Sequence, residues 1–169
     1  KANQAMIKQI SLLILATLIF AGCGPQQFGG AAGGEAPPAD PRAEQMWTTD
    51  LPAAQARAKT ADKLVFIDFT GSDWCPPCMA LHDHVLVQKP FLDFAEKNLE
   101  LVVIDFPKNK PLDQKVELAN RALAEQYKVE SFPTLIVLDA AGNMVHRDEG
   151  YGGKKAEAFT AELKQKLGR

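Results

Sequence analysis

Two cysteines, Cys75 and Cys78, lie three positions apart shortly after a run of β-branched and aromatic residues at 64–69. Such a run predicts a buried strand, and the loop at 70–73 leads from it into a helix that begins near the cysteines. Free N–H groups and a partial positive charge at a helix N-terminus stabilise a thiolate and lower the pKa of the first cysteine. Because the thiolate is the attacking species in disulfide exchange, this placement favours redox chemistry.

Two other interpretations of the cysteine pair stay open at this point. A structural disulfide across so short a loop would remove little chain entropy and would stabilise the fold weakly. A zinc site would need two further ligands, for which the nearby candidates are His82, Asp83 and His84. We predict no metal site and interpret Cys75 and Cys78 as a redox-active disulfide.

The segment Trp74–Cys78, with the sequence WCPPC, is the first of two blocks that resemble the thioredoxin superfamily. The second block runs over 127–138, and its Pro133 stands where the family has a cis proline that faces the cysteines. Gly150 occupies the family's glycine position before the last helix. The resemblance covers about residues 45–167. It implies an α/β, thioredoxin-like fold, in which helices flank both faces of a central mixed β-sheet.

The resemblance also implies roles for individual residues. Cys75 would attack a substrate disulfide, Cys78 would resolve the mixed disulfide, and Pro133 would shape the substrate groove. Asp68 would be the family's buried proton acceptor; one additional residue separates it from Cys75, and we expect that residue in the loop at 70–73. The residues that surround the active site would be Trp74, Pro76, Pro77 and Phe132.

The two prolines between the cysteines bear on the direction of electron flow. Pro76 and Pro77 have no backbone N–H, so Cys78 offers the first donor to the Cys75 sulfur. A less stabilised thiolate means a more negative reduction potential, which favours donating electrons. We therefore predict a reductase of protein disulfides. The alternatives are a disulfide oxidase or isomerase with the same residues, and a thioredoxin-fold binding module without redox turnover.

Residues 1–22 have the features of a lipoprotein signal peptide. Lys1 and Lys8 are their only charges, and the apolar run at 10–20 is too short to span a bilayer comfortably. The small residues directly before Cys23 resemble the lipobox of bacterial lipoproteins, which implies lipidation of Cys23. An uncleaved signal anchor and an ordinary secretory signal are the alternatives.

The remaining chain divides into two parts by composition. Residues 23–45 comprise the lipidated cysteine and a flexible linker rich in Gly, Pro and Ala, and residues 46–169 form the thioredoxin-like domain. We expect a lipid-anchored protein of the bacterial cell envelope that faces the periplasm or the exterior. Its partners would be protein thiol or disulfide substrates and an upstream membrane electron donor, and we expect no cofactor.

The charge balance excludes nucleic acid as a partner. Nineteen Lys and Arg stand against twenty-one Asp and Glu, a formal charge of −2, and no basic stripe is available to neutralise phosphates.

Periodicity and turn residues predict the other elements. We expect Trp47 in or near a short edge strand, and an apolar helical stripe over 112–127 that packs in the core. Helices are predicted at 51–61, 77–87, 90–98 (with a break near Pro90) and 153–167, and strands at 101–106, 133–139 and 143–148, the last two joined by a turn at 139–143.

Overall fold

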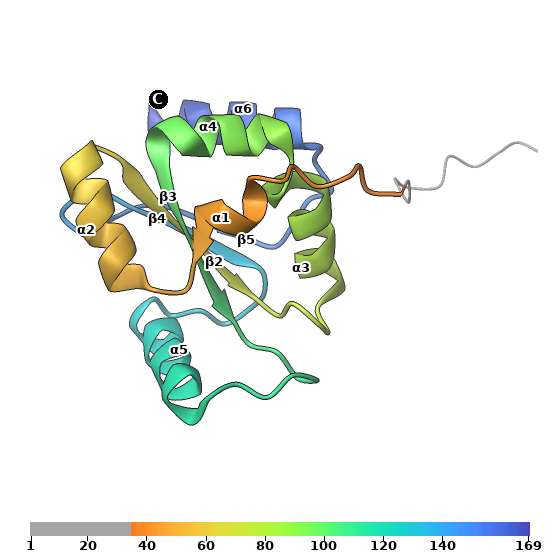
Figure 1. The fold of residues 1–169 in the computed structure, drawn as a ribbon, viewed down its shortest axis with the longest axis vertical. Helices are drawn as coiled ribbons and strands as arrows, with labels where there is room; N and C mark the ends of the chain where they lie inside the picture. Colours follow the sequence, from red (N-terminus) through yellow and green to blue (C-terminus); the bar gives the residue numbers. More distant parts are fainter. Residues whose placement is uncertain (1–34) are drawn as a thin grey trace, which may run out of the picture. The chain divides into compact units, whose positions relative to one another are not determined.

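A computed structural model describes residues 35–169, which are arranged around a five-stranded sheet (Figure 1). The strand order is β1-β3-β2-β4-β5; the pairs β1–β3 and β2–β3 are parallel, and the pairs β2–β4 and β4–β5 are antiparallel. This arrangement confirms the predicted α/β architecture with a central mixed sheet. The elements in chain order are α1 (Ala43–Met46), β1 (Trp47–Thr48), α2 (Leu51–Ala61), β2 (Leu64–Thr70), α3 (Pro76–Leu81), η1 (His82–Leu86), α4 (Lys89–Asn98), β3 (Leu99–Asp105), α5 (Gln114–Gln126), β4 (Thr134–Leu138), β5 (Met144–Glu149) and α6 (Ala156–Leu167).

The central strand β2 carries the predicted buried run. All seven of its residues are buried, as expected for a strand covered on both faces. Its pairing with β3 runs without a register shift from Leu64 to Thr70. Any additional residue before Cys75 therefore lies in the loop after Thr70, where the sequence predicts it.

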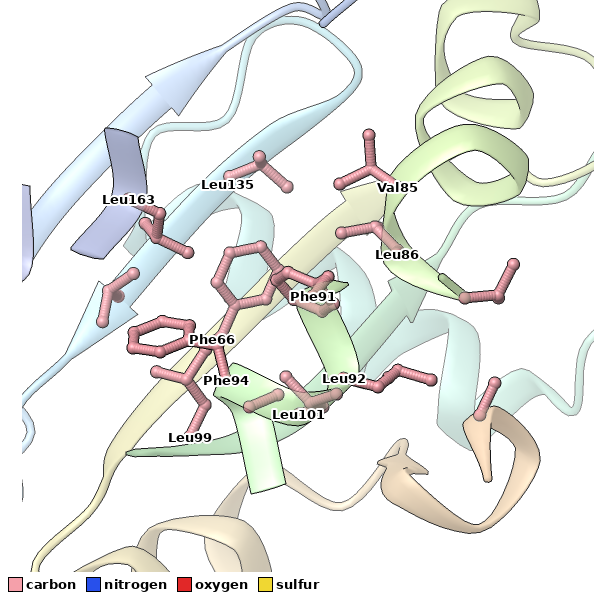
Figure 2. Packing of buried hydrophobic residues seen from close by; sticks show 14 of the residues in the cluster. Phe66, Val85, Leu86, Phe91, Leu92, Phe94, Leu99, Leu101, Leu135 and Leu163 are labelled. Atoms are coloured by element: carbon pink, nitrogen blue, oxygen red, sulfur yellow. The ribbon is translucent and has the colours of Figure 1, made fainter. Parts of the chain in front are cut away.

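One face of the sheet is covered by α3, η1, α4 and α6. Phe66 of β2 points to this side and lies among side chains of α4 and of the neighbouring strands (Figure 2). Its ring meets that of Phe91 edge to face, with 5.3 Å between the centroids. Leu163 of α6 is buried in the same cluster, and Phe159 packs against it, so both residues point inward as predicted.

The opposite face is covered by α2 and by part of α5. The side chains of Leu51, Ala54 and Ala58 on α2 pack against the residues of β2 that alternate with Phe66. The helix begins after Asp50, whose carboxylate accepts a hydrogen bond from the Ala53 N–H at 2.9 Å. Its bounds confirm the helix predicted at 51–61.

The prediction that the stripe at 112–127 lies in the core is wrong for the first half of α5. Val116 is 41% exposed, because the helix follows a loop that has left the sheet and only its C-terminal half reaches the core. Leu123 and Tyr127 do pack against the core. Asn120 is the buried residue of the helix, and its side-chain amide donates a hydrogen bond to the Asp105 carbonyl at 2.8 Å.

The helix predicted at 77–87 begins at Pro76 as α3 and continues as the π-helix η1. The Val87 N–H donates to the His82 carbonyl at 3.2 Å, which closes the wider turn of a π-helix. The predicted break before the next helix is confirmed, and Pro90 occupies the first turn of α4. The π-helical turn itself has no signal in the sequence.

The N-terminal segment 37–46 packs against the rest of the folded domain. The folded domain therefore begins before residue 46, where the sequence predicts its start. The Arg42 guanidinium donates to the carboxylates of Asp93 and Glu96 on α4, at 2.7 and 2.9 Å. The Asp40 N–H donates to the Val87 carbonyl at 2.8 Å. These contacts hold residues that the sequence assigns to a flexible linker.

The signal peptide at 1–22 and the lipidation of Cys23 lie outside the described residues and stay predictions. Within residues 35–169, no helix combines the length and the hydropathy needed to cross a bilayer.

Candidate active site

Cys75 and Cys78 form a disulfide at the start of α3, with 5.3 Å between their Cα atoms. Cys75 is the N-cap residue; its N–H donates to the Gly71 carbonyl and its own carbonyl accepts from the Met79 N–H, both at 3.0 Å. The exposed fraction is 4% for Cys75 and 1% for Cys78. Cys75 is thus slightly more exposed than Cys78, although both residues are buried.

Pro133 lies directly before β4 and is buried. The Phe132–Pro133 peptide bond is cis, as the sequence resemblance implies. Because Phe69 of β2 pairs with Thr134, this proline lies at the end of the sheet where β2 leads to the cysteines. The Pro133 carbonyl accepts a hydrogen bond from the Gly150 N–H at 2.8 Å. The fold thus brings the two sequence blocks to the same end of the sheet.

Aromatic rings surround this end of the sheet. The Trp74 and Phe132 rings meet edge to face with centroids 6.0 Å apart, so the residue before Cys75 contacts the residue before Pro133. Phe106, directly after β3, adds a third ring 5.1 Å from that of Phe132. Pro76 and Pro77 are exposed in the first turn of α3. The surroundings of the disulfide are therefore largely apolar.

The loop at 106–112 holds Trp74 in place, which the sequence does not predict. The indole Nε1–H donates to the Phe106 carbonyl at 2.7 Å, and the Lys108 ammonium lies 3.5 Å from the ring centroid. The Asp73 carboxylate accepts from the backbone N–H groups of Lys108 and Asn109, at 2.9 and 2.7 Å. The two prolines of this loop are visible in the sequence, but its contact with the tryptophan is not.

Gly71 lies against the Trp74 ring, and its lack of a side chain allows this close contact. A Cβ atom at this position would lie 2.6 Å from the Trp74 Cε2 atom, closer than packed side chains allow. The next residue, Ser72, fixes the loop to β3, since its N–H and hydroxyl both donate to the Asp105 carboxylate at 2.9 and 2.6 Å. Two consecutive residues thus anchor the loop before Cys75: Ser72 binds to β3, and Asp73 binds to the loop at 106–112.

Asp68 lies in the interior of β2 and is 4% exposed. The pKa of this carboxyl is raised to about 7. Burial is the larger cause, and the negative charge of Asp105 is the smaller one. Its Oδ1 atom has no hydrogen-bond partner among residues 35–169. It lies on the same side of β2 as Phe66, toward the helices that follow Cys75. A carboxyl that changes charge near neutral pH suits the proton acceptor implied by the resemblance.

The zinc alternative has no support in the geometry. In the described part of the chain, no group of three or more His, Cys, Asp or Glu side chains is arranged to hold a metal ion. The His82 Nδ1 atom lies 2.8 Å from an Asp83 carboxylate oxygen, and both side chains are more than half exposed. The sulfur atoms that would bind zinc are joined to each other.

Known proteins with a thioredoxin-like domain resemble this chain in sequence and in structure. The family model for a thioredoxin-like domain matches residues 51–167. The disulfide bond reductase DsbH of Chlamydia pneumoniae is 32% identical over 125 residues, which make up 74% of each chain. A solved structure of a DsbH oxidoreductase superposes with a TM-score of 0.67 at 29% identity, covering 82% of this chain and 96% of that one. The reduced C-terminal domain of DsbD from Neisseria meningitidis has a TM-score of 0.50 at 26% identity, covering 72% of this chain and 99% of that one.

Proposed function

Because this chain belongs to the thioredoxin-like family and is a thiol–disulfide oxidoreductase, we propose that it reduces disulfide bonds in other proteins outside the cytoplasm. The observation that carries the proposal is the Cys75–Cys78 disulfide at the first turn of α3, with two prolines between its cysteines. The name of the Chlamydia relative, a disulfide bond reductase, points in the same direction.

The reaction is two successive thiol–disulfide exchanges. The Cys75 thiolate attacks one sulfur of the substrate disulfide, whose S–S bond breaks and releases the first substrate thiolate. Cys78 then loses its proton to Asp68 and attacks the Cys75 sulfur, which releases the second substrate thiolate. The substrate has gained two electrons, and the protein is left with the Cys75–Cys78 disulfide.

Three residues position the substrate rather than exchange electrons. Pro133, at the same end of the sheet as the cysteines, shapes the groove in which a substrate chain lies and keeps competing groups away from the thiolate. Trp74 packs beside the cysteine pair and is held there by the loop at 106–112. Phe132, which contacts Trp74, closes the apolar side of the groove.

The direction of the reaction rests on the first turn of α3. The missing N–H groups of Pro76 and Pro77 leave the Cys75 thiolate with fewer donors, which makes the dithiol a stronger reductant. Each turnover then requires two electrons from a donor that reduces the Cys75–Cys78 disulfide. We assign this step to a dithiol of a membrane protein, and the likeness to the C-terminal domain of DsbD supports that class of donor.

We also propose that the protein is anchored to a membrane of the bacterial cell envelope by lipid on Cys23, after removal of residues 1–22. The apolar run followed by small residues before Cys23 supports this anchor. The domain would then face the periplasm or the exterior.

Insulin reduction tests the proposed activity. With dithiothreitol as electron source, the wild-type chain should accelerate insulin precipitation, and Cys75→Ser should abolish the acceleration. Cys78→Ser should instead accumulate a mixed disulfide with insulin, because the resolving thiol is absent. The variant Cys23→Ser is the matched control, since it removes a cysteine but leaves the redox pair intact. A wild-type chain as inactive as Cys75→Ser would favour a binding module without redox turnover.

A further inference from the structure

A cavity of about 470 Å³ lies between the N-terminal segment 39–47 and the sheet. The sheet contributes Asp68 of β2 and Val103 of β3, which are paired neighbours. Most of the remaining lining comes from segment 39–47, and η1 supplies the rest. This segment is therefore the part of the chain that faces Asp68 across the cavity.

The segment packs on the face of the sheet that carries Asp68. Ala43 is buried in the same cluster as Phe66, and Trp47 packs against that cluster. Asp68 follows Phe66 by two positions in β2, so its side chain lies on the same face. Because segment 39–47 forms one wall of the cavity beside this buried residue, displacing the segment would open the cavity to bulk water.

Arg42 is the side chain that links this segment to α4. Its guanidinium donates to the carboxylates of Asp93 and Glu96, at 2.7 and 2.9 Å. It also donates to the Asp40 carboxylate at 2.7 Å, which fixes the turn that precedes α1. The Asp40 N–H in turn donates to the Val87 carbonyl at the end of η1. The position of the segment therefore depends on contacts that lie outside the redox site.

The charged groups that face Asp68 belong to three elements. Asp105 lies on β3, Asp40 and Glu44 belong to the N-terminal segment, and His82 belongs to η1. Within the described chain, α3 and β4 add no charged side chain when the cysteines are oxidised. Neighbouring carboxylates and the exclusion of water both favour the protonated form of a carboxyl. The segment supplies both influences.

We propose that Arg42 is a positioning residue for Asp68, because it holds segment 39–47 over the cavity and the segment limits the access of water to the carboxyl. The inference rests on the proposed function, in which Asp68 accepts the proton of Cys78. With the segment displaced, the carboxyl is better hydrated and releases its proton at lower pH. The N-terminal segment thus sets the pH range in which the resolving step runs.

Carboxyl-carbon NMR of the oxidised full chain tests the inference without relying on activity. The Asp68 signal, assigned by its loss in Asp68→Asn, reports the pH at which this residue ionises. The double variant Arg42→Ala/Ala43→Gln removes the ion pairs and puts a larger polar side chain at a buried position, so we expect the segment to detach. The midpoint of Asp68 should then fall by on the order of one pH unit. Arg42→Ala alone should give a smaller fall.

Arg57→Ala is the matched control. Arg57 also forms an ion pair, with Glu100 at 2.7 Å, but it belongs to α2 on the opposite face of the sheet. The midpoint of Asp68 in this variant should equal that of wild type. A fall as large as in Arg42→Ala would show that loss of any surface ion pair shifts the midpoint, and would overturn the inference.

The resolving step is measured with dithionitrobenzoate, a small aromatic disulfide. The Cys75 thiolate of the reduced chain attacks it and releases one aromatic thiolate; Cys78 then attacks the Cys75 sulfur and releases the second. The pH at which the second release reaches half its maximal rate should fall in the double variant as the NMR midpoint does. An NMR midpoint that falls while the second release keeps its pH dependence would contradict Asp68 as proton acceptor, which belongs to the proposed function.

Hydrogen exchange shows whether the segment has moved. The Asp40 amide, which donates to the Val87 carbonyl, should exchange faster in the double variant, while the amides of β2 stay protected. Faster exchange with an unchanged Asp68 midpoint would overturn the inference. So would an Asp40 amide that stays protected, because Arg42 would then not hold the segment. Arg42→Ala alters no core side chain, so an unchanged midpoint there decides the matter if the double variant does not fold.

Discussion

At the scale of single residues, Cys75 and Cys78 differ in access although they share one disulfide. Cys75 caps the N-terminus of α3, whereas Cys78 lies one turn into the helix and is the more deeply buried of the two. In the reduced protein we expect iodoacetamide to label Cys75 first, with an apparent pKa below the value of about 8.5 for a free thiol. Labelling rates measured against pH, with the site located by mass spectrometry, check this.

The single-cysteine variants provide the controls for that labelling. Cys78→Ser should keep the fast phase, and Cys75→Ser should lose it. Faster labelling of Cys78 than of Cys75 would reverse the roles assigned to the two sulfurs.

Asp68 makes the stability of the fold depend on pH. The unfolded carboxyl ionises near 3.8, but burial keeps the folded one protonated up to about 7. The unfolded state releases its proton first, so this residue lowers the free energy of unfolding as pH rises from about 4 to about 7 and adds no further change above that. Between pH 4 and pH 8, Asp68→Asn should gain about 4 kcal/mol relative to wild type.

Urea unfolding of both chains across this pH range measures the effect. Asp62→Asn is the matched control, since Asp62 is exposed and its left-handed backbone conformation suits asparagine as well as aspartate. Parallel wild-type and Asp68→Asn curves would mean that Asp68 ionises normally in the folded state.

The sequence predicts the residues of the redox pair better than the contacts around them. Cys75, Cys78 and Pro133 are found from motifs, because local chemistry fixes their types and spacing. The contact of Lys108 with Trp74 joins positions 34 apart in the chain, and no local pattern encodes it. The same holds for the ion pairs of Arg42 with α4.

At the scale of elements, we expect the first turn of α3 to set the reduction potential. With Pro76 and Pro77 in this turn, we expect a midpoint nearer to thioredoxin's value of about −270 mV than to the value of about −120 mV for a strong oxidant of the family. Pro77→His restores one backbone N–H and adds an imidazole, so the midpoint should rise. Equilibration with glutathione buffers, followed by Trp74 fluorescence, measures both proteins.

The wild-type midpoint tests the reductase assignment, and the Pro77→His midpoint tests the argument from the missing N–H groups. A wild-type midpoint above about −150 mV would replace the reductase assignment with the oxidase alternative. An unchanged midpoint in Pro77→His would refute the argument from the missing N–H groups while leaving the reductase assignment in place.

The loop at 106–112 acts as a clamp on the active-site tryptophan. Asp73→Ala removes the carboxylate that accepts from the N–H groups of Lys108 and Asn109, so we expect the loop to move away and Trp74 to become more exposed. The emission of Trp74 should shift to longer wavelength and the rate of insulin reduction should fall. Trp47→Phe provides the background in which Trp74 is the only emitter.

Lys110→Ala is the control for this clamp, because it changes the charge of the same loop without removing a contact to the indole. Emission that is the same in Asp73→Ala and in its parent would show that the tryptophan holds its place without the loop.

Secondary structure is predictable here where one pattern dominates. Strand β2 and helix α2 have strong local signals, a continuous apolar run in one and an Asp cap followed by proline in the other. The apolar positions of α5 suggest a buried face, yet Val116 of that face remains exposed. The position of a helix over a sheet depends on the loop that precedes it. The hydrophobic periodicity of the helix contains no information about that loop.

At the scale of the whole molecule, the proposed anchor decides where the protein acts. When the protein is expressed with its leader in a bacterial host, we expect membrane fractionation and a diacylated Cys23, because two acyl chains give stable anchoring. Cys23→Ser should move the protein to the soluble fraction. Mass spectrometry of the mature N-terminus checks the modification, and an unmodified Cys23 or cleavage at another site would contradict it.

The contacts that hold residues 37–42 against the folded domain have a mechanical consequence. If Cys23 is held in a membrane, tension on the tether first reaches residues 37–42, where Arg42 bridges to Asp93 and Glu96 and the Gln88 side chain donates to the Pro37 carbonyl. That point adjoins the end of η1, roughly 16 Å along the helical segment from Cys75 at about 1.5 Å per residue. We therefore expect the ion pairs of Arg42 to take up tension before it reaches the redox end.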